Sequence, residues 1–181
     1  MSPSREEAAL ALREISNVQA RVAGFQDYRF EASQLILWGV LNITGCVLTA
    51  LLQSYLLLIW GCVATTGVLV GARMAKASSD SPGVVPRYLL IVLSILLFDV
   101  ILHLLFWPIT PRQGAMIVPL FVATLYVIRG AQSRPRYIVI GTALATLCCC
   151  TYLFAGAAYW WLLALSWGGT LVVSGCWLRR C

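Results

Sequence analysis

Six long apolar runs, separated by short polar connections, dominate the chain. They cover residues 32–51, 55–74, 88–107, 114–128, 137–154 and 159–178. Because a helix needs about 20 apolar residues to cross a bilayer, this pattern predicts an all-α polytopic membrane protein with six transmembrane helices. The fourth run is the shortest and contains Pro119. A kinked or partly re-entrant segment is therefore the alternative to a full crossing there.

The connections between the runs predict how neighbouring helices pair. Only Gln53 and Ser54 separate the first two runs, and residues 155–158 separate the last two. Helices joined by so short a turn must be antiparallel neighbours. We therefore expect three antiparallel hairpins side by side over residues 31–181.

Composition supports lipid as the main solvent and partner of the chain. Of its 181 residues, 60% are hydrophobic and 11% are charged, whereas soluble domains carry about 25% charged residues. The net charge of +6 is spread in ones, twos and threes between apolar runs. Such a distribution is typical of topology signals rather than of a phosphate-binding patch, so we expect no nucleic-acid partner.

The basic residues predict the orientation of the bundle. In the six-span arrangement twelve of the thirteen Lys and Arg residues fall on one side of the membrane, and only Arg112 falls on the other. Basic residues concentrate on the cytoplasmic side of membrane proteins. The N-terminus and the C-terminus are therefore both expected in the cytoplasm.

Residues 1–30 are expected to form a cytoplasmic arm with helical character. Ser4 and Glu7 have the spacing of a capping box, and apolar residues then recur at intervals of four and three, as on one face of a helix. This predicts an amphipathic helix that rests on the inner leaflet or binds a protein partner or a second copy of the chain. The stripe consists of Ala11, Ile15, Val18, Val22 and Phe25.

Asp99 and His103 are the strongest candidates for a functional site inside the membrane. Their spacing of four places them on one face of the third helix. Ionisable residues are costly in lipid and often mark proton or ion pathways, and an imidazole beside a carboxylate can relay a proton. The alternative is a structural hydrogen bond. Asn42 in the first helix is a further polar candidate, expected to hydrogen-bond to another helix.

Cysteines and glycines are expected to serve packing. The seven cysteines include no C-x-x-C pair, so we expect no metal and no cofactor, because metal ligands usually repeat at short spacing. A soft-metal site would have to draw on His103, Asp99, Cys46, Cys62 and Cys148. Small residues allow close helix approach, which we expect at Gly67, Gly71, Gly141, Gly168 and Gly169.

Motifs of catalysis are absent from the sequence, which predicts a protein that is not an enzyme. There is no Gly-x-Ser-Gly, His-Glu-x-x-His or glycine-rich phosphate loop. Intramembrane serine proteases, zinc proteases and nucleotide-driven pumps are therefore unsupported.

Several short segments resemble a group of small six-span bacterial inner-membrane proteins of uncharacterised function. These segments are Leu12-Arg13-Glu14-Ile15, the stretches 125–130 and 136–141, and the end of the chain from Gly175 to Arg180. The resemblance implies a location in the bacterial inner membrane, which is a plasma membrane. We expect a non-enzymatic sensor, regulatory or accessory subunit that acts through the N-terminal helix. The alternative is a small oligomeric proton- or metal-linked transporter or channel that uses Asp99 and His103.

Overall fold

A computed structural model describes residues 30–78, 83–132 and 135–180 of the chain. The predicted amphipathic arm and its stripe lie outside the described residues. Within the described ranges every regular element is a helix.

Six helical segments are long and apolar enough to cross a membrane, which confirms the predicted number. The first helix, Phe30–Leu51, is followed by Gln53–Ser78, which joins η1 (Gln53–Tyr55) to α2 (Leu56–Ser78). Next come α3 (Val84–Leu105), α4 (Pro111–Gln132) and α5 (Arg136–Phe154). The last segment, Gly156–Arg179, contains η2 (Gly156–Ala158), α6 (Tyr159–Leu163), the π-helical turn η3 (Ala164–Gly169) and α7 (Thr170–Arg179). The described residues thus have the six long apolar helices that a multi-pass helical membrane protein requires.

The fourth helix is longer than its apolar run. It begins at Pro111 and continues through the buried Pro119 to Gln132 as one helix of 22 residues. Thr110 and Gln113 close a capping box, because the Thr110 N–H and hydroxyl both donate to Gln113 Oε1, at 3.1 Å and 2.8 Å. The predicted bounds of 114–128 were therefore too narrow, and α4 is not broken at its proline.

The third helix ends earlier than its apolar run. Its last residue is Leu105, two residues before the predicted end, and Phe106 caps it by donating its N–H to Leu102 O. Pro108 explains the difference, since a proline restricts the residue before it to extended conformations. His103 consequently lies in the last turn of α3 rather than well inside the span.

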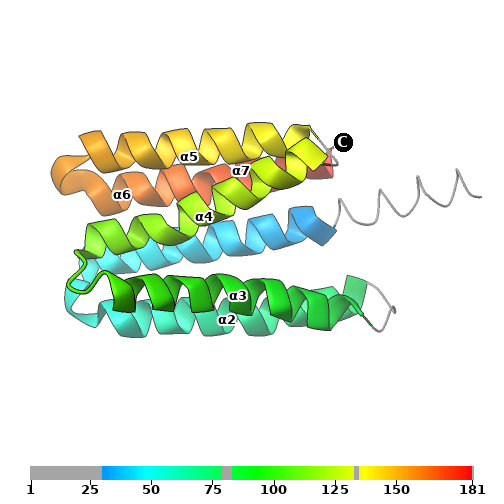
Figure 1. The fold of residues 1–181 in the computed structure, drawn as a ribbon, viewed down its shortest axis with the longest axis horizontal. Coiled ribbons are helices and arrows are strands. Elements are labelled where there is room, and N and C mark those ends of the chain that lie inside the picture. The colour runs from blue at the N-terminus through cyan, green and yellow to red at the C-terminus, as the bar shows by residue number, and fades with distance from the viewer. Residues whose placement is uncertain (1–29, 79–82, 133–134, 181) are drawn as a thin grey trace, which may run out of the picture.

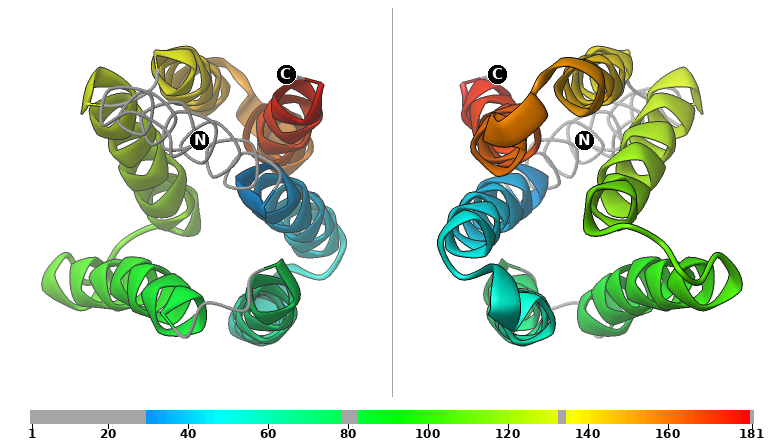
Figure 2. Two further views of the ribbon diagram at one scale, coloured as in Figure 1. Left: turned by 90° about the vertical axis from the view of Figure 1, so that its right-hand side faces the viewer. Right: turned by 90° about the vertical axis from the view of Figure 1, so that its left-hand side faces the viewer.

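The helices run alongside one another and form a ring in chain order (Figures 1 and 2). Each helix from α2 to α5 contacts the next, and α5 contacts α6 and α7. The ring closes where the first helix meets the last segment: Gly39 lies against Gly168 and Val172. The start of the first helix and the end of α7 lie at the same end of the ring (Figure 1).

Two hydrophobic cores of unequal size hold the ring together. The large core joins the first helix, α4, α5 and the last segment, and contains the fully buried Tyr137, Leu144, Cys148 and Leu163. The small core lies between α2 and α3, and its buried members among the described residues are Ala75, Tyr88 and Val92. Trp38 of the first helix packs against both cores.

Four of the five glycines expected at close contacts occupy such places, in two different ways. A Cβ on Gly168 would lie 2.7 Å from Gly39 O, and one on Gly141 would lie 2.5 Å from Ala123 O, so helix backbones approach directly there. Gly67 and Gly71 instead receive the side chains of Trp38 and Tyr88. Gly169 differs from the expectation, because no atom lies within 4 Å of the place of its Cβ.

Candidate functional site

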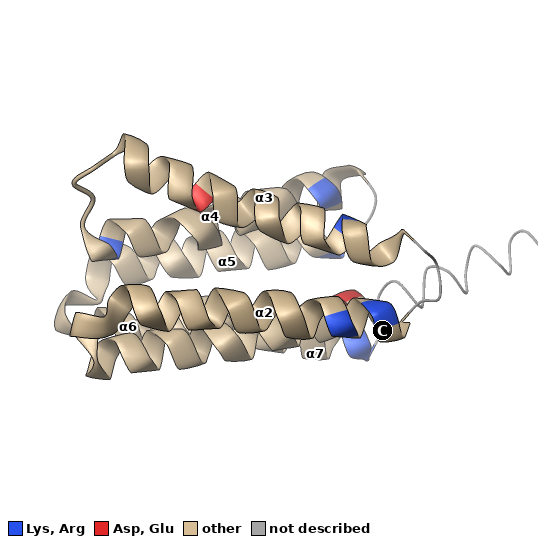
Figure 3. Cartoon of the chain, turned by 90° about the horizontal axis from the view of Figure 1, so that it is seen from below, with Lys and Arg blue, Asp and Glu red and all other residues tan. Residues whose placement is uncertain are grey.

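Charged residues gather at one end of the ring (Figure 3). We call this end, which holds the C-terminus, the basic end. Among the described residues its cations are Arg73, Lys76, Arg87, Arg129, Arg136, Arg179 and Arg180. The opposite end carries Arg112, and we call it the Arg112 end.

The predicted pair of Asp99 and His103 is in contact, toward the Arg112 end of α3. His103 Nδ1 lies 2.9 Å from the main-chain oxygen of Asp99 and 3.3 Å from the carboxylate Oδ1. A carbonyl oxygen can only accept, so Nδ1 must carry a hydrogen and donate it to the Asp99 carbonyl. The carboxylate lies close enough to attract the Nδ1–H electrostatically. Its Oδ1 accepts no hydrogen bond from the described residues.

Asp99 and His103 lie on the face of α3 that packs against its neighbours, α2 and α4. They continue the row that contains the buried Tyr88 and Val92, at helical intervals of four and seven. Their side chains are only partly buried, with 27% of Asp99 and 40% of His103 exposed. The pair therefore lies at the edge of the packed region, although Asp99 Oδ1 itself is buried.

The imidazole of His103 rests on α4 at Gly114. A Cβ on this glycine would lie 3.2 Å from His103 Cε1 and 3.4 Å from Cδ2, and it would overlap with Nε2 between them. Beside this contact Phe98 of α3 stacks on Phe121 of α4, with ring centroids 4.2 Å apart. Gly114 thus belongs to the site. Sequence reasoning missed it because nothing in one sequence says which helix faces His103.

A second polar cluster, at the basic end, fixes the start of the first helix. Glu31 forms an ion pair with Arg129 of α4, and Arg179 of α7 donates to Ser33 Oγ at 3.0 Å. The Arg129 guanidinium also lies over the ring of Tyr137, 5.4 Å from its centroid. We call the contacts of Glu31 and Ser33 with these two arginines the clamp. An acidic residue at the head of an apolar run was its only sequence signal.

A third set of polar contacts joins α2 to its neighbours. Gln34 of the first helix donates to Gly71 O at 3.0 Å, and Tyr88 of α3 donates to Gly67 O at 2.9 Å. Both acceptors are main-chain carbonyls that the absence of a side chain leaves accessible. The main-chain oxygens of Gly67 and Gly71 therefore accept hydrogen bonds from two polar side chains of other helices.

Within the described part of the chain, Asn42 forms no bond to another helix, which is the bond expected of it. Its side-chain amide donates to Trp38 O, one turn earlier in the same helix, at 2.7 Å. The residue is buried, with 4% of its surface exposed. Asn42 satisfies its donor locally instead of linking two helices by it.

The residues of a soft-metal site are not assembled in the part of the chain that the structure describes. No group of three His, Cys, Asp or Glu residues there could hold a metal ion. Cys46 and Cys148 are buried in the large core, whereas Cys62 is exposed on α2. Asp99 and His103 belong to α3, which packs on α2 and α4.

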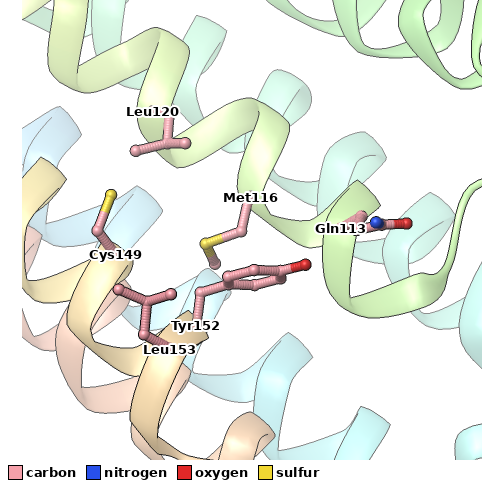
Figure 4. A pocket seen from close by; sticks show the side chains of 6 residues that line it. All are labelled: Gln113, Met116, Leu120, Cys149, Tyr152 and Leu153. Carbon is pink, nitrogen blue, oxygen red and sulfur yellow. The ribbon is translucent and has the colours of Figure 1, made fainter.

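A shallow hollow of about 280 Å³ lies between α4 and α5, toward the Arg112 end (Figure 4). Met116 and Tyr152 face each other across it, and its walls are almost wholly apolar. It offers no acid and base pair for catalysis. The lining residues are Gln113, Met116, Leu120, Cys149, Tyr152 and Leu153.

No protein-family model, curated protein or solved structure matches this chain. The resemblance to six-span bacterial inner-membrane proteins therefore stays a prediction.

Proposed function

We propose that the chain is a non-enzymatic subunit of a membrane assembly, with a sensory, regulatory or accessory role. In this proposal residues 1–30 are a cytoplasmic amphipathic helix that binds a protein partner or a second copy of the chain. The bundle anchors this helix in a plasma membrane, with three hairpins in the membrane and both termini in the cytoplasm.

The clamp is the observation that supports this proposal most strongly. The arm is continuous in sequence with the first helix, and the first turn of that helix is tied to α4 through Glu31 and to α7 through Ser33. Ala32, between them, is fully buried, and its main-chain oxygen lies against Gly175 of α7. A force on the arm would therefore reach three helices at once, which is what a coupling subunit requires.

The charge distribution supports the proposed orientation. Seven described cations lie at the basic end against one at the Arg112 end. The same asymmetry orients many membrane proteins, because basic connections stay on the cytoplasmic side. The basic end, with the clamp, would then face the cytoplasm and its protein partners.

Photocrosslinking from the arm of the full chain, in native membranes, tests the proposal. We expect a photoreactive residue at Val18 or Val22, on the predicted stripe, to crosslink to one defined protein. The same residue at Ser16 or Ala20, on the opposite face of the predicted helix, is the matched control. Crosslinks to lipid alone from the stripe positions would contradict partner binding.

A second candidate function, a proton-linked transporter or channel, is favoured by the Asp99 and His103 pair. Both residues lie on the packed face of α3, and the imidazole is oriented by a hydrogen bond, as a relay group would be. Proton flux into liposomes that contain the chain tests this candidate. Asp99→Asn and His103→Ala should each reduce the flux at least tenfold, and unchanged flux in both would exclude a role for the pair.

A further inference from the structure

The hollow between α4 and α5 is polar at one end and apolar elsewhere. At the end nearer the start of α4, the Tyr152 hydroxyl points toward Gln113 (Figure 4). The remaining walls are formed by Met116, Leu120, Cys149 and Leu153. One end of the hollow can therefore donate hydrogen bonds, whereas the rest offers only apolar contact.

The side-chain amide of Gln113 has a fixed orientation. Its Oε1 accepts from the N–H and the hydroxyl of Thr110, at 3.1 Å and 2.8 Å. A main-chain N–H can only donate, so the oxygen faces Thr110 and the Nε2 amino group points away from it. Nε2 donates to no residue that the structure describes, and its hydrogens are available to a ligand in the hollow.

The guanidinium of Arg112 lies beside the polar end of the hollow. Arg112 is exposed, and its Cζ lies over the ring of Tyr159, 5.4 Å from the centroid. The Tyr159 ring in turn meets the ring of Tyr152 edge to face, with centroids 6.4 Å apart. The ion pairs among the described residues do not include Arg112. Its positive charge is therefore not neutralised by a described acid.

The hollow opens to the outside of the ring of helices. On α4, the side chains of Ala115, Val118 and Val122 pack against the large core. Gln113 and Thr124 are exposed and lie on the opposite side of α4, because successive helical residues are rotated by about 100°. A ligand on this side of α4 would come from the surrounding lipid.

A second hollow of about 280 Å³ lies on the same side of α4, between α3 and α4. Leu120 lines both hollows, and Thr124 is the last residue of α4 in the second one. From Gln113 to Thr124 the helix rises about 16 Å, at about 1.5 Å per residue. This length matches the hydrocarbon of one leaflet, which is half of a core about 30 Å thick.

We propose that the outer face of α4 binds one anionic phospholipid from the leaflet at the Arg112 end. Its phosphate contacts the Arg112 guanidinium and the Gln113 amino group, and its two acyl chains lie in the two hollows on either side of Leu120. Arginine pairs strongly with phosphate because its N–H groups match the phosphate oxygens. This inference goes beyond the proposed function, since it holds whether or not the arm binds a protein.

The head group, rather than the acyl chains, should select this lipid. Lipid tails solvate apolar side chains as well as one another, so the hollows position the chains without favouring any head group. A zwitterionic lipid carries its own cation beside the phosphate, and that cation is repelled by Arg112. An anionic lipid such as phosphatidylglycerol has no such cation, and its charge complements the unneutralised guanidinium.

Photoreactive lipids test the site in the full chain. The chain is placed in phosphatidylcholine liposomes with a small fraction of a diazirine probe, either phosphatidylglycerol or phosphatidylcholine, and labelled peptides are identified by mass spectrometry. The phosphatidylglycerol probe should label residues 113–120 and 149–153 at least about threefold more, the size of one exposed ion pair. Both probes should label the segment around Leu97, exposed on α3, equally. Equal labelling of residues 113–120 and 149–153 by both probes would overturn the proposal.

The contribution of the guanidinium is tested by removing it. Arg112→Gln should make the labelling of residues 113–120 by the two probes equal. Arg136→Gln, which removes an exposed arginine from the start of α5 at the basic end, is the matched control and should keep the preference. A preference that survives in Arg112→Gln would contradict the phosphate site.

The contribution of the hollow is tested by filling it. Cys149→Phe places a ring in the hollow from an exposed position, and should reduce the labelling of residues 113–120 by both probes to that of the Leu97 segment. Cys150→Phe, at an exposed neighbour that lines neither hollow, is the control and should leave the labelling unchanged. Unchanged labelling in Cys149→Phe would show that the acyl chain lies elsewhere.

A second copy of the chain is the other occupant that the hollow could have. A photoreactive residue in place of Leu153, which lines the hollow and is 69% exposed, should crosslink to lipid. Crosslinked dimers of the chain from this position would instead overturn the lipid site. Neither result bears on the crosslinks expected from Val18 and Val22 in the arm, so the two proposals fail separately.

Discussion

The last segment and α3 are both apolar enough to cross a membrane, but they are held in the bundle very differently. Half of the residues in the most apolar window of the last segment are buried, against 11% in that of α3. The last segment packs through Gly168 and Gly175 directly onto the backbone of the first helix. The third helix depends on a small core and on a few side-chain contacts.

The difference shows that hydropathy and packing are separate properties of a membrane helix. Of the six candidate spans α3 has the highest hydropathy and the lowest burial. Its own large apolar side chains project on all sides of the helix, and most of them contact no other helix. Lipid solvates such residues as well as another helix does, so they bring no driving force for association. Small residues that let backbones approach are what distinguish the first helix and the last segment.

The largest expected effect comes from truncating one leucine in each region. Leu163→Ala in α6 removes a side chain with 0% exposure from the large core and should lower the free energy of unfolding by about 2–5 kcal/mol. Leu97→Ala in α3, where 61% is exposed, should change it by less than about 0.5 kcal/mol. Unfolding of both variants in mixed micelles measures the difference. Equal losses would contradict the contrast between the two regions.

Two adjacent glycines sharpen the comparison within the last segment. Gly168→Ala forces a methyl group to within 2.5 Å of Ile43 Cγ1 and should destabilise the protein by about 1–3 kcal/mol. Gly169→Ala meets no atom within 4 Å and should be neutral or stabilise the helix by up to about 1 kcal/mol. The same unfolding assay measures both variants, and a Gly169→Ala variant as unstable as Gly168→Ala would contradict the close packing of Gly168 on the first helix.

A smaller effect is expected where α3 is attached to α2. Tyr88→Phe removes the hydroxyl that donates to Gly67 O at 2.9 Å, without changing the packing of the ring. The loss should be about 1 kcal/mol, as for a single hydrogen bond. Thr65→Val, which removes a hydroxyl bonded within α2 itself, is the control. If the two variants were equally stable, the Tyr88 bond would not attach α3.

The smallest effect is expected at the clamp. The Arg129 side chain is 49% exposed, so Glu31→Gln should reduce the free energy of unfolding by no more than about 1 kcal/mol. The ion pair should also weaken as salt is raised, because exposed charges are screened. Unfolding at low and high ionic strength measures both effects. A loss of several kcal/mol would mean that the clamp stabilises the fold rather than couples the arm to it.

The sequence predicted the helical class and the number of spans, because lipid demands long apolar helices whatever their packing. It also predicted correctly that Asp99 and His103 meet, since a spacing of four brings side chains together within one helix. Its errors in the helix bounds lie at helix ends, because capping side chains and prolines determine where a helix begins and stops. The run Thr110-Pro111-Arg112-Gln113 is a capping signal that hydropathy does not contain, and Pro108 stops α3 inside an apolar stretch.

Contacts between helices were predicted poorly, because a single sequence does not say which faces meet. The Gly67 and Gly71 motif indicated a smooth surface, yet two side chains rather than a helix backbone fill it. The roles of Gly114, Gly39 and Glu31 depend on residues that are 11 to 133 positions away in sequence, as between His103 and Gly114 or Gly39 and Val172. Only the three-dimensional arrangement reveals such contacts.

Hydrogen exchange of the full chain in lipid nanodiscs tests the contrast between the two regions most directly. Exchange of an amide within a span requires the helix to open, so its rate reports how firmly the helix is held. We expect the amides around Leu97 in α3 to exchange at least about tenfold faster than those around Leu171 in α7, a difference of about 1.4 kcal/mol in opening free energy. Equal rates, or slower exchange in α3, would contradict the account.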